Sequence, residues 1–238
     1  MARRRTGSPP PLPTGEEKTA RVRAMFDTIA PRYDLINRLM TFGLDQAWRR
    51  GTVAALALPA GSLVLDLACG TGDLSRLALR SGYRVVGADL SAGMLGANGS
   101  ATPLVEGDGS HLPFVAGAFD GLVCGYALRN FTDLAATLTE SARVLRPGGR
   151  LAVLEVDTPT APLWRAGYDL WFTKAVPALG AALSDKEAYR YLPQSVAYLP
   201  PTPVLRTMLR QAGFSAVGIR PLAGGLSQMV VATRTGGP

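Results

Sequence analysis

The chain has 238 residues, of which 47% are hydrophobic and 18% are charged, and it contains 27 glycines and 18 prolines. This length and apolar share suffice for one sizeable core, and the composition excludes a coiled coil and a wholly disordered chain. The net charge of +7 would suit nucleic acid or anionic lipid, but three positive charges are Arg3, Arg4 and Arg5 and the others are spread out. We therefore expect a globular protein with a solvated basic surface.

The apolar runs and the cysteines do not indicate a membrane-spanning or secreted protein. The run Leu170–Leu183 is shorter than the roughly 18 to 20 residues that span a bilayer, and a lysine and a proline interrupt it. The N-terminal arginines are not followed by the apolar stretch of a secretory signal. Cys69 and Cys124 supply neither a disulfide framework nor the spacing of a zinc site. We expect a cytoplasmic protein without a metal, and a flexible tail at residues 1–16.

Apolar runs alternate with helical stretches along the chain, which predicts a doubly wound α/β fold with a mostly parallel, seven-stranded sheet. The predicted strands are 63–67, 84–89, 103–106, 119–125, 150–157, 216–222 and 228–233. Helix-spaced apolar residues predict helices at 72–81, 91–98 and 134–145. Their N-terminal capping candidates are Asp73, Ser91, and Thr132 or Asp133.

Two segments stand outside this alternation. Residues 17–58 precede the first strand and contain the predicted helices 17–30, 34–40 and 45–56. Residues 159–211 form an insert between the fifth and sixth strands that is rich in Leu, Trp, Tyr and Phe. We expect both segments to form a lid over the carboxyl edge of the sheet, where open α/β sheets bind ligands. Residues 17–238 are then a single domain.

The segment Val64–Asp73 is an apolar strand with an acidic residue, Asp66, followed by a turn that opens a helix. The residues of that turn are Gly70, Thr71 and Gly72. Such a turn could hold a dinucleotide pyrophosphate, but the third glycine of that pattern is absent and Asp66 would repel phosphate. The ammonium of a zwitterionic ligand would instead pair with this carboxylate. S-adenosylmethionine is such a ligand, and we expect it as the cofactor.

Acidic and glycine residues also follow the next strands. Asp89 ends the second strand, where the ribose diol lies in doubly wound folds. Asp108 and Gly109 follow the third strand and offer an acceptor near the adenine, while Gly125 ends the fourth. Each acid alone is also explained as a cap or turn residue. Together, in register with Asp66, they predict an S-adenosylmethionine site.

The order of these motifs resembles that of class I methyltransferases over residues 60–235. Further stretches narrow the resemblance to the family that C-methylates demethylmenaquinone and ubiquinone precursors. These stretches are Phe26–Asn37 with Phe42, Gly43 and Trp48, then Ala127–Asn130, Arg143–Arg150, Leu154 with Glu155, and Tyr189–Leu192. The chain departs from the family's pattern at Ile36, Thr41, Asp45 and Asp157, where Met, Ser, His and Ser are usual. These departures leave the exact acceptor open.

The resemblance implies metal-free methyl transfer to a ring carbon of a demethylated prenyl quinol. The catalytic groups that it implies are Tyr33, Asp34, Arg129 and Asn130, with the arginine stabilising a developing phenolate. The residues expected to line the acceptor pocket are Tyr189, Arg190 and Tyr191. The alternatives are a capping or surface role for the arginine, a simple turn at positions 33 and 34, and core packing of the insert's aromatic residues.

A prenyl quinol resides in the bilayer, so we expect peripheral contact with the inner face of the membrane without an anchor. The sequence leaves open whether the protein forms a homodimer. No clustered basic stripe with interleaved aromatic residues appears, so nucleic acid is not expected as a partner. Two other functions are weighed: methylation of another small aromatic acceptor, such as a secondary-metabolite phenol, and a non-catalytic module that binds the cofactor.

Overall fold

The computed structural model describes residues 14–30, 34, 38, 41, 43–157, 159 and 195–236. Within these residues one seven-stranded sheet has the order β3-β2-β1-β4-β5-β7-β6. Its strands are β1 (Leu63–Leu67), β2 (Arg84–Asp89), β3 (Leu104–Glu106), β4 (Phe119–Gly125), β5 (Leu145–Val156), β6 (Phe214–Leu222) and β7 (Ser227–Arg234). Only β7 runs antiparallel to its neighbours. The doubly wound, mostly parallel fold predicted from the sequence is confirmed.

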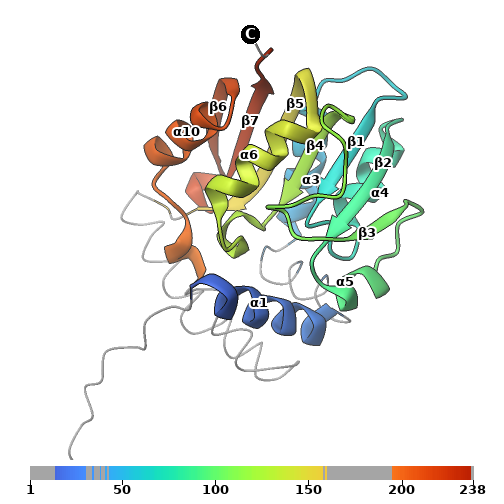
Figure 1. Ribbon diagram of the computed structural model, residues 1–238, viewed down its shortest axis with the longest axis vertical. Helices are drawn as coiled ribbons and strands as arrows, with labels where there is room; N and C mark the ends of the chain where they lie inside the picture. Colours follow the sequence, from blue (N-terminus) through green and yellow to red (C-terminus); the bar gives the residue numbers. More distant parts are fainter. Residues whose placement is uncertain are drawn as a thin grey trace, which may run out of the picture.

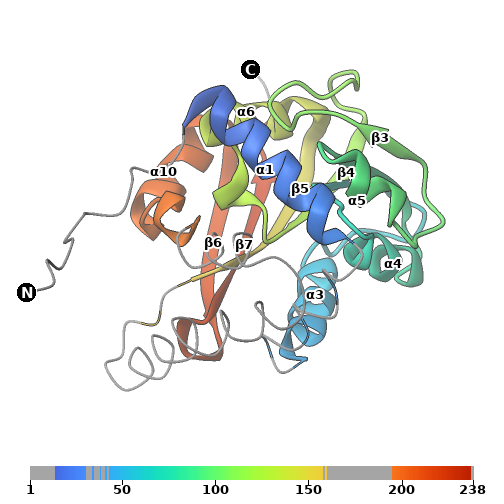
Figure 2. The same cartoon turned by 90° about the horizontal axis from the view of Figure 1, so that it is seen from below.

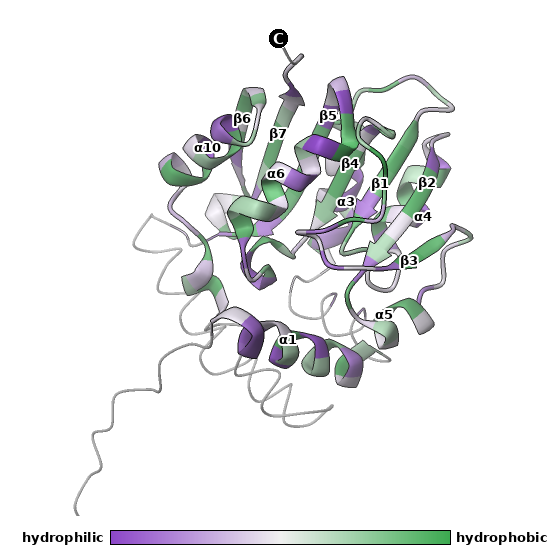
Figure 3. Cartoon of the chain, in the orientation of Figure 1, coloured by the Kyte–Doolittle hydropathy of each residue, from purple (hydrophilic) through white to green (hydrophobic). Residues whose placement is uncertain are grey.

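Helices cover both faces of this sheet (Figure 1). The α-helices are α1 (Gly15–Ile29), α3 (Leu44–Ala54), α4 (Asp73–Arg80), α5 (Ala92–Gly96), α6 (Leu134–Val144) and α10 (Thr202–Gln211), and the short 3-10 helices are η2 (Leu128–Asn130), η4 (Val196–Tyr198) and η5 (Ala223–Gly225). The α3 and α4 helices pack on one face with Val64 and Val123, while α6 and α10 pack on the other with Leu65 and Leu122. This division follows from the strand geometry, because successive side chains point to opposite faces. The central strand β4 and much of β5 are coloured as hydrophobic in Figure 3.

Two of the three helix caps predicted from the sequence are confirmed. The Ser91 side chain accepts from the Met94 backbone N–H, and the Asp133 side chain caps α6. The cap of α4 is Gly72 rather than the predicted Asp73. Gly72 has φ of +85°, a left-handed conformation in which glycine avoids the steric cost of a side chain.

The α1 helix lies across the carboxyl edge of the sheet, over the ends of β1, β2 and β3 (Figures 1 and 2). This is the edge that the leading segment was predicted to cover. The α1 helix begins at Gly15, two residues before the predicted start. Asp34 and Arg38 are described from the second predicted helix. The rest of that helix, like residues 1–13 of the tail, lies outside the described residues.

The predicted lid insert, 159–211, needs a correction at its end. Thr202–Gln211 forms α10, which packs along β6, and its Leu205 and Leu209 are buried in the core beside Phe214. The i, i+4 spacing of these leucines places both on one helix face, and the sheet covers that face. Residues 160–194 lie outside the described residues. No helix among the residues that the structure describes is long and apolar enough to cross a membrane.

Candidate active site

A cleft opens at the carboxyl ends of β1, β2 and β4, under α1. Between β1 and β4 the strand order reverses, and this is the position where doubly wound sheets bind ligands. The cleft encloses about 980 Å³ of space, open solvent at its mouth included. Seven of the eight positions predicted for the cofactor line it: Asp66, Gly70, Thr71, Asp89, Asp108, Gly109 and Gly125. The eighth, Gly72, is not among the lining residues.

Asp66 lies on β1 at the bottom of the cleft and is fully buried. Its Oδ2 accepts a hydrogen bond from the Ser75 hydroxyl at 2.6 Å, while its Oδ1 has no hydrogen-bond partner. Burial raises the pKa of this carboxyl to about 7, against the lowering effects of Ser75 and the Arg49 guanidinium. A buried acceptor without a partner is costly, so Asp66 is suited to a cationic or hydrogen-bond-donating ligand group.

The turn after β1 is tied to the end of β2. The Gly70 backbone N–H donates to Asp89 Oδ2 at 2.8 Å, and the Gly70 carbonyl accepts from the Asn98 amide at 2.8 Å. The other Asp89 oxygen accepts from the Ser91 backbone N–H at 2.9 Å. Burial raises the pKa of Asp89, and these backbone donors counteract that rise. The two segments predicted to hold the cofactor therefore form one connected unit. Gly72 starts α4 behind this turn.

The remaining predicted cofactor residues form two further walls of the cleft. Asp108 Oδ1 accepts from the backbone and the hydroxyl of Ser110, both at 2.8 Å, so this carboxylate orders its own turn as well as facing the cleft. A methyl group on Gly109 would lie 3.0 Å from the Phe131 ring, and one on Gly125 would lie 2.9 Å from Leu74. Both glycines are therefore needed for close packing at the edge of the cleft.

Polar contacts fasten α1 to three loops around the cleft. Asp27 Oδ1 accepts from the Ser91 hydroxyl at 2.5 Å and from the Gly93 backbone at 2.9 Å. Arg23 forms an ion pair with Glu106, which ends β3. Lys18 donates to the Phe131 carbonyl at 2.6 Å, and its Nζ lies 3.8 Å from the centre of the Tyr198 ring. The helix therefore spans the cleft and is held along its length.

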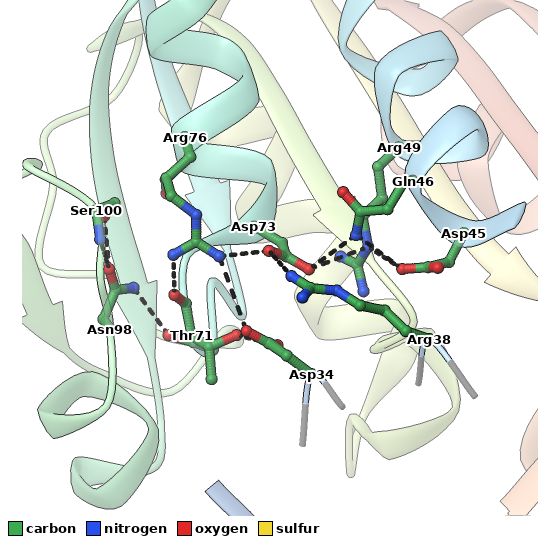
Figure 4. A network of polar contacts seen from close by, with 12 residues as sticks. Asp34, Arg38, Asp45, Gln46, Arg49, Thr71, Asp73, Arg76, Asn98 and Ser100 are labelled. Carbon is green, nitrogen blue, oxygen red and sulfur yellow. Dashed lines mark hydrogen bonds and ion pairs between the residues drawn. The ribbon is translucent and has the colours of Figure 1, made fainter. Parts of the chain in front are cut away.

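A second group of charges borders the cofactor turn (Figure 4). Asp34, one of the predicted catalytic residues, accepts from the Thr71 hydroxyl at 2.6 Å and lies 3.8 Å from Arg76. Arg76 also pairs with Asp73. Burial would raise the pKa of Asp73, but the Arg49 and Arg76 guanidinium groups outweigh it and the pKa is lowered. Asp34 therefore holds the leading segment on the cofactor turn.

Two departures from the family's pattern contact each other in this group. The Thr41 hydroxyl donates to Asp45 Oδ1 at 2.9 Å, and the other Asp45 oxygen lies 3.4 Å from Arg49 Nε. Asp45 is fully buried. The two positions at which the chain departs from the family's pattern are therefore hydrogen-bonded to each other.

Arg129 and Asn130, which were predicted to be catalytic, lie in different environments. Arg129 is buried in an ion pair with Glu155 on β5, and its Nε donates to the Ser195 hydroxyl at 3.1 Å. Among the described residues that line the cleft, Asn130 is present and Arg129 is not. The Asn130 amide donates to the Tyr126 carbonyl at 3.4 Å. The other predicted site residues, Tyr33, Tyr189, Arg190 and Tyr191, lie outside the described residues.

Arg49 and Tyr126 are among the lining residues that were not predicted from the sequence. Arg49 on α3 reaches the cleft, and its guanidinium lies 5.3 Å from the centre of the Tyr126 ring. Tyr126 follows β4 with φ of +60°, a conformation that costs a non-glycine residue roughly 1–3 kcal/mol and is enriched at functional sites. Its hydroxyl is buried without a hydrogen-bond partner. A signal for Arg49 was present, because it stands four residues after Asp45 on a predicted helix.

The arrangement is compatible with the predicted S-adenosylmethionine site, because Asp66, Asp89 and Asp108 all line one cleft and Asp66 presents a buried oxygen without a hydrogen-bond partner. No group of three or more His, Cys, Asp or Glu residues that could hold a metal occurs in the described part of the chain.

Comparisons with known proteins agree with this fit. The family model described as the ubiE/COQ5 methyltransferase family matches residues 14–235. A demethylmenaquinone methyltransferase of Corynebacterium kroppenstedtii is 41% identical over 93% of this chain and 97% of its own length. The ubiquinone/menaquinone biosynthesis C-methyltransferase UbiE of a Geobacter species is 37% identical over 92% of this chain and 98% of its own.

Solved structures agree at the level of the fold. A Thermotoga maritima S-adenosylmethionine-dependent methyltransferase superposes with a TM-score of 0.63 at 19% identity, over 90% of this chain and all of that one. A shared fold alone does not identify a function, whereas a family model and relatives that match nearly the whole chain identify its family. The chain therefore belongs to the ubiE/COQ5 methyltransferase family, and it is an S-adenosylmethionine-dependent C-methyltransferase.

Proposed function

We propose that this enzyme methylates a ring carbon of a demethylated prenyl quinol, with demethylmenaquinol as the first candidate. The observation that carries the proposal is the 41% identity, over 93% of the chain, to a relative named demethylmenaquinone methyltransferase. That likeness includes the segments before β1 and between β5 and β6, which lie outside the generic cofactor fold. Those segments are where family members would differ if they took different acceptors.

The chemistry asks little of the protein beyond orientation and the exclusion of water. The cofactor supplies a methyl group that is already electrophilic. The acceptor ring carbon becomes nucleophilic when a neighbouring hydroxyl loses its proton, so the site must stabilise phenolate charge. The α1 helix covers part of the cleft and would limit the access of water to it, and the tied turns after β1 and β2 would fix the position of the ligand.

We assign the acceptor side of the cleft to Asn130. Its side-chain amide is a donor on the cleft wall after β4, suitably placed for an oxygen of the acceptor. Arg129 acts as a positioning residue, because its pairing with Glu155 holds the turn that carries Asn130. Asp34 and Tyr33 close the site over the cofactor turn. Tyr189, Arg190 and Tyr191 complete the acceptor pocket, as the family resemblance implies.

The substrate also implies where the enzyme works. A prenyl quinol is dissolved in the bilayer, so the enzyme must take it from a membrane surface, and the chain's net charge of +7 favours an anionic one. We propose transient contact with the inner face of the membrane. A homodimer is compatible with this arrangement.

The test is methyl transfer from labelled S-adenosylmethionine to demethylmenaquinol in detergent micelles, with the product analysed by mass. One methyl group is expected on a ring carbon. The oxidised quinone is the matched control and should not react, because it has no hydroxyl to deprotonate. A demethylated ubiquinol precursor, tested in parallel, decides between the two quinone classes. Transfer to a soluble phenol, with none to either prenyl quinol, would overturn the proposal.

A further inference from the structure

Arg49 is a buried cation that lines the cleft. It lies on α3 and is 5% exposed. Its Nε is 3.4 Å from Asp45 Oδ2 and 3.7 Å from Asp73 Oδ2, so the two carboxylates hold one edge of the guanidinium (Figure 4).

The opposite edge of the guanidinium extends toward the end of β4. A Cβ atom on Gly125 would lie 3.4 Å from Arg49 Nη1, and the guanidinium carbon lies over the Tyr126 ring. Gly125, Tyr126 and Asp66 all line the cleft together with Arg49. The absence of a side chain at position 125 thus leaves room for the cation at the cleft wall.

Arg49 and Asp66 together make one end of the cleft dipolar. Arg49 is close enough to Asp66 to lower the pKa of its carboxyl, and Asp66 Oδ1 is a buried acceptor without a partner. Asp73, which also lines the cleft, pairs with both Arg49 and Arg76, and the remaining acids, Asp89 and Asp108, lie at and just beyond the ends of β2 and β3. A cation and an anion side by side are complementary to an α-amino acid zwitterion, while the far end suits a neutral sugar and base.

We propose that Arg49 binds the α-carboxylate of the cofactor while Asp66 binds its α-ammonium. The planar fork of arginine matches a carboxylate, and the two aspartates on its Nε side preset the fork before the ligand arrives. Arg49 is then a specificity residue for the intact amino-acid group. The rival role is purely structural, in which Arg49 only joins α3 to α4 through Asp45 and Asp73.

The experiment compares two ligands that differ only in the carboxylate: S-adenosylhomocysteine and its decarboxylated form, which keeps the amine. Calorimetry on the full chain should show that the parent protein binds the intact ligand roughly 10- to 100-fold more tightly, as expected for charge-assisted hydrogen bonds. In Arg49→Met, affinity for S-adenosylhomocysteine should fall by that factor, while affinity for the decarboxylated ligand should change less than about threefold. Arg49→Lys should keep part of the preference.

Arg50→Met is the matched control, because it removes the same charge from the neighbouring position of α3, which is exposed and does not line the cleft. It should leave the preference for the carboxylate in place. If Arg49→Met weakens both ligands equally, or leaves S-adenosylhomocysteine binding unchanged, the assignment is wrong. Thermal unfolding of each variant identifies those that fold, and Arg49→Lys supplies the answer where Arg49→Met does not fold.

Discussion

At the scale of single residues, the most consequential group is the Asp66 carboxyl, because its pKa of about 7 lies in the working pH range. The ligand ammonium binds the ionised form. Below pH 7 the ligand-free protein carries a proton on Asp66 that must leave on binding. Cofactor affinity should therefore fall about tenfold for each pH unit below 7 and level off above it.

Calorimetry of S-adenosylhomocysteine binding from pH 5.5 to 8, in buffers of different ionisation enthalpy, measures this proton release. In Asp66→Asn, binding should be much weaker and independent of pH over that range. The same pKa makes the ligand-free fold lose stability as the pH rises from 4 to 7, where the unfolded carboxyl is ionised and the folded one is not. Asp66→Asn should therefore raise the Tm at pH 8 without ligand. A flat affinity profile in the parent would refute this reading of Asp66.

Asn130 and Arg129 should respond differently to substitution. Asn130→Ala removes a donor in the cleft, so the rate of single-turnover methyl transfer should fall by roughly 100-fold, with S-adenosylhomocysteine affinity within about threefold of the parent. A rate close to that of the parent would remove Asn130 from the acceptor site.

Arg129→Met leaves Glu155 buried without its partner, which should destabilise the fold by about 3–5 kcal/mol. The double variant with Glu155→Leu should recover much of that stability, because no charge is then left uncompensated. Denaturant unfolding measures both. Full recovery of the transfer rate in the double variant supports a positioning role, while a rate that stays low in a stable double variant would return Arg129 to the chemistry.

At the scale of elements, α1 covers the cleft, and Asp27 holds one of its ends. Asp27→Ala removes the acceptor for the Ser91 hydroxyl and the Gly93 backbone. Dissociation of S-adenosylhomocysteine should accelerate roughly 5- to 20-fold, because α1 opens more readily. Stopped-flow displacement measures the rate. Thr28→Ala is the control, since that hydroxyl bonds only within its own helix in the described contacts. Equal rates in Asp27→Ala and the parent would mean that α1 does not limit ligand release.

The elements were largely predictable from the sequence, and their exceptions have local causes. Six strands start within two residues of their predicted positions, because buried parallel strands are short apolar runs. The start of β5 was predicted at Arg150 but lies at Leu145. The intervening Arg-Pro-Gly-Gly segment has turn composition, which masked the strand.

Site residues were predictable from the sequence where they stand at strand ends. They were not predictable where their role depends on a contact with a residue far away in the sequence. Asp66 and Asp89 follow directly from the strand pattern. Arg129 was placed in the chemistry, but Glu155, 26 residues away, pairs with it. Arg49 was missed because an Asp and an Arg four residues apart are also an ordinary surface pair on a helix. Spacing along the chain does not tell which side of a helix the cleft occupies.

At the scale of the whole molecule, the net charge of +7 should govern contact with membranes. Sedimentation with anionic vesicles should show weak binding at low salt and little at 0.5 M salt, because screened charges beyond the Debye length contribute little. Vesicles of zwitterionic lipid are the control and should bind less at every salt concentration. Binding that persists in high salt would indicate insertion of an apolar segment instead.

The strand order also sets a sequence of events in time. β5 ends at Val156, whereas its neighbour β7 begins only at Ser227 and inserts between β5 and β6. During synthesis, β1 to β5 can assemble the cofactor half while the outer edge of β5 awaits a partner still to be translated. Unpaired edges promote aggregation, and parallel or distant pairings form slowly. A nascent chain of this enzyme thus passes through a stage in which its ligand site is nearly complete and its sheet is still open on one side.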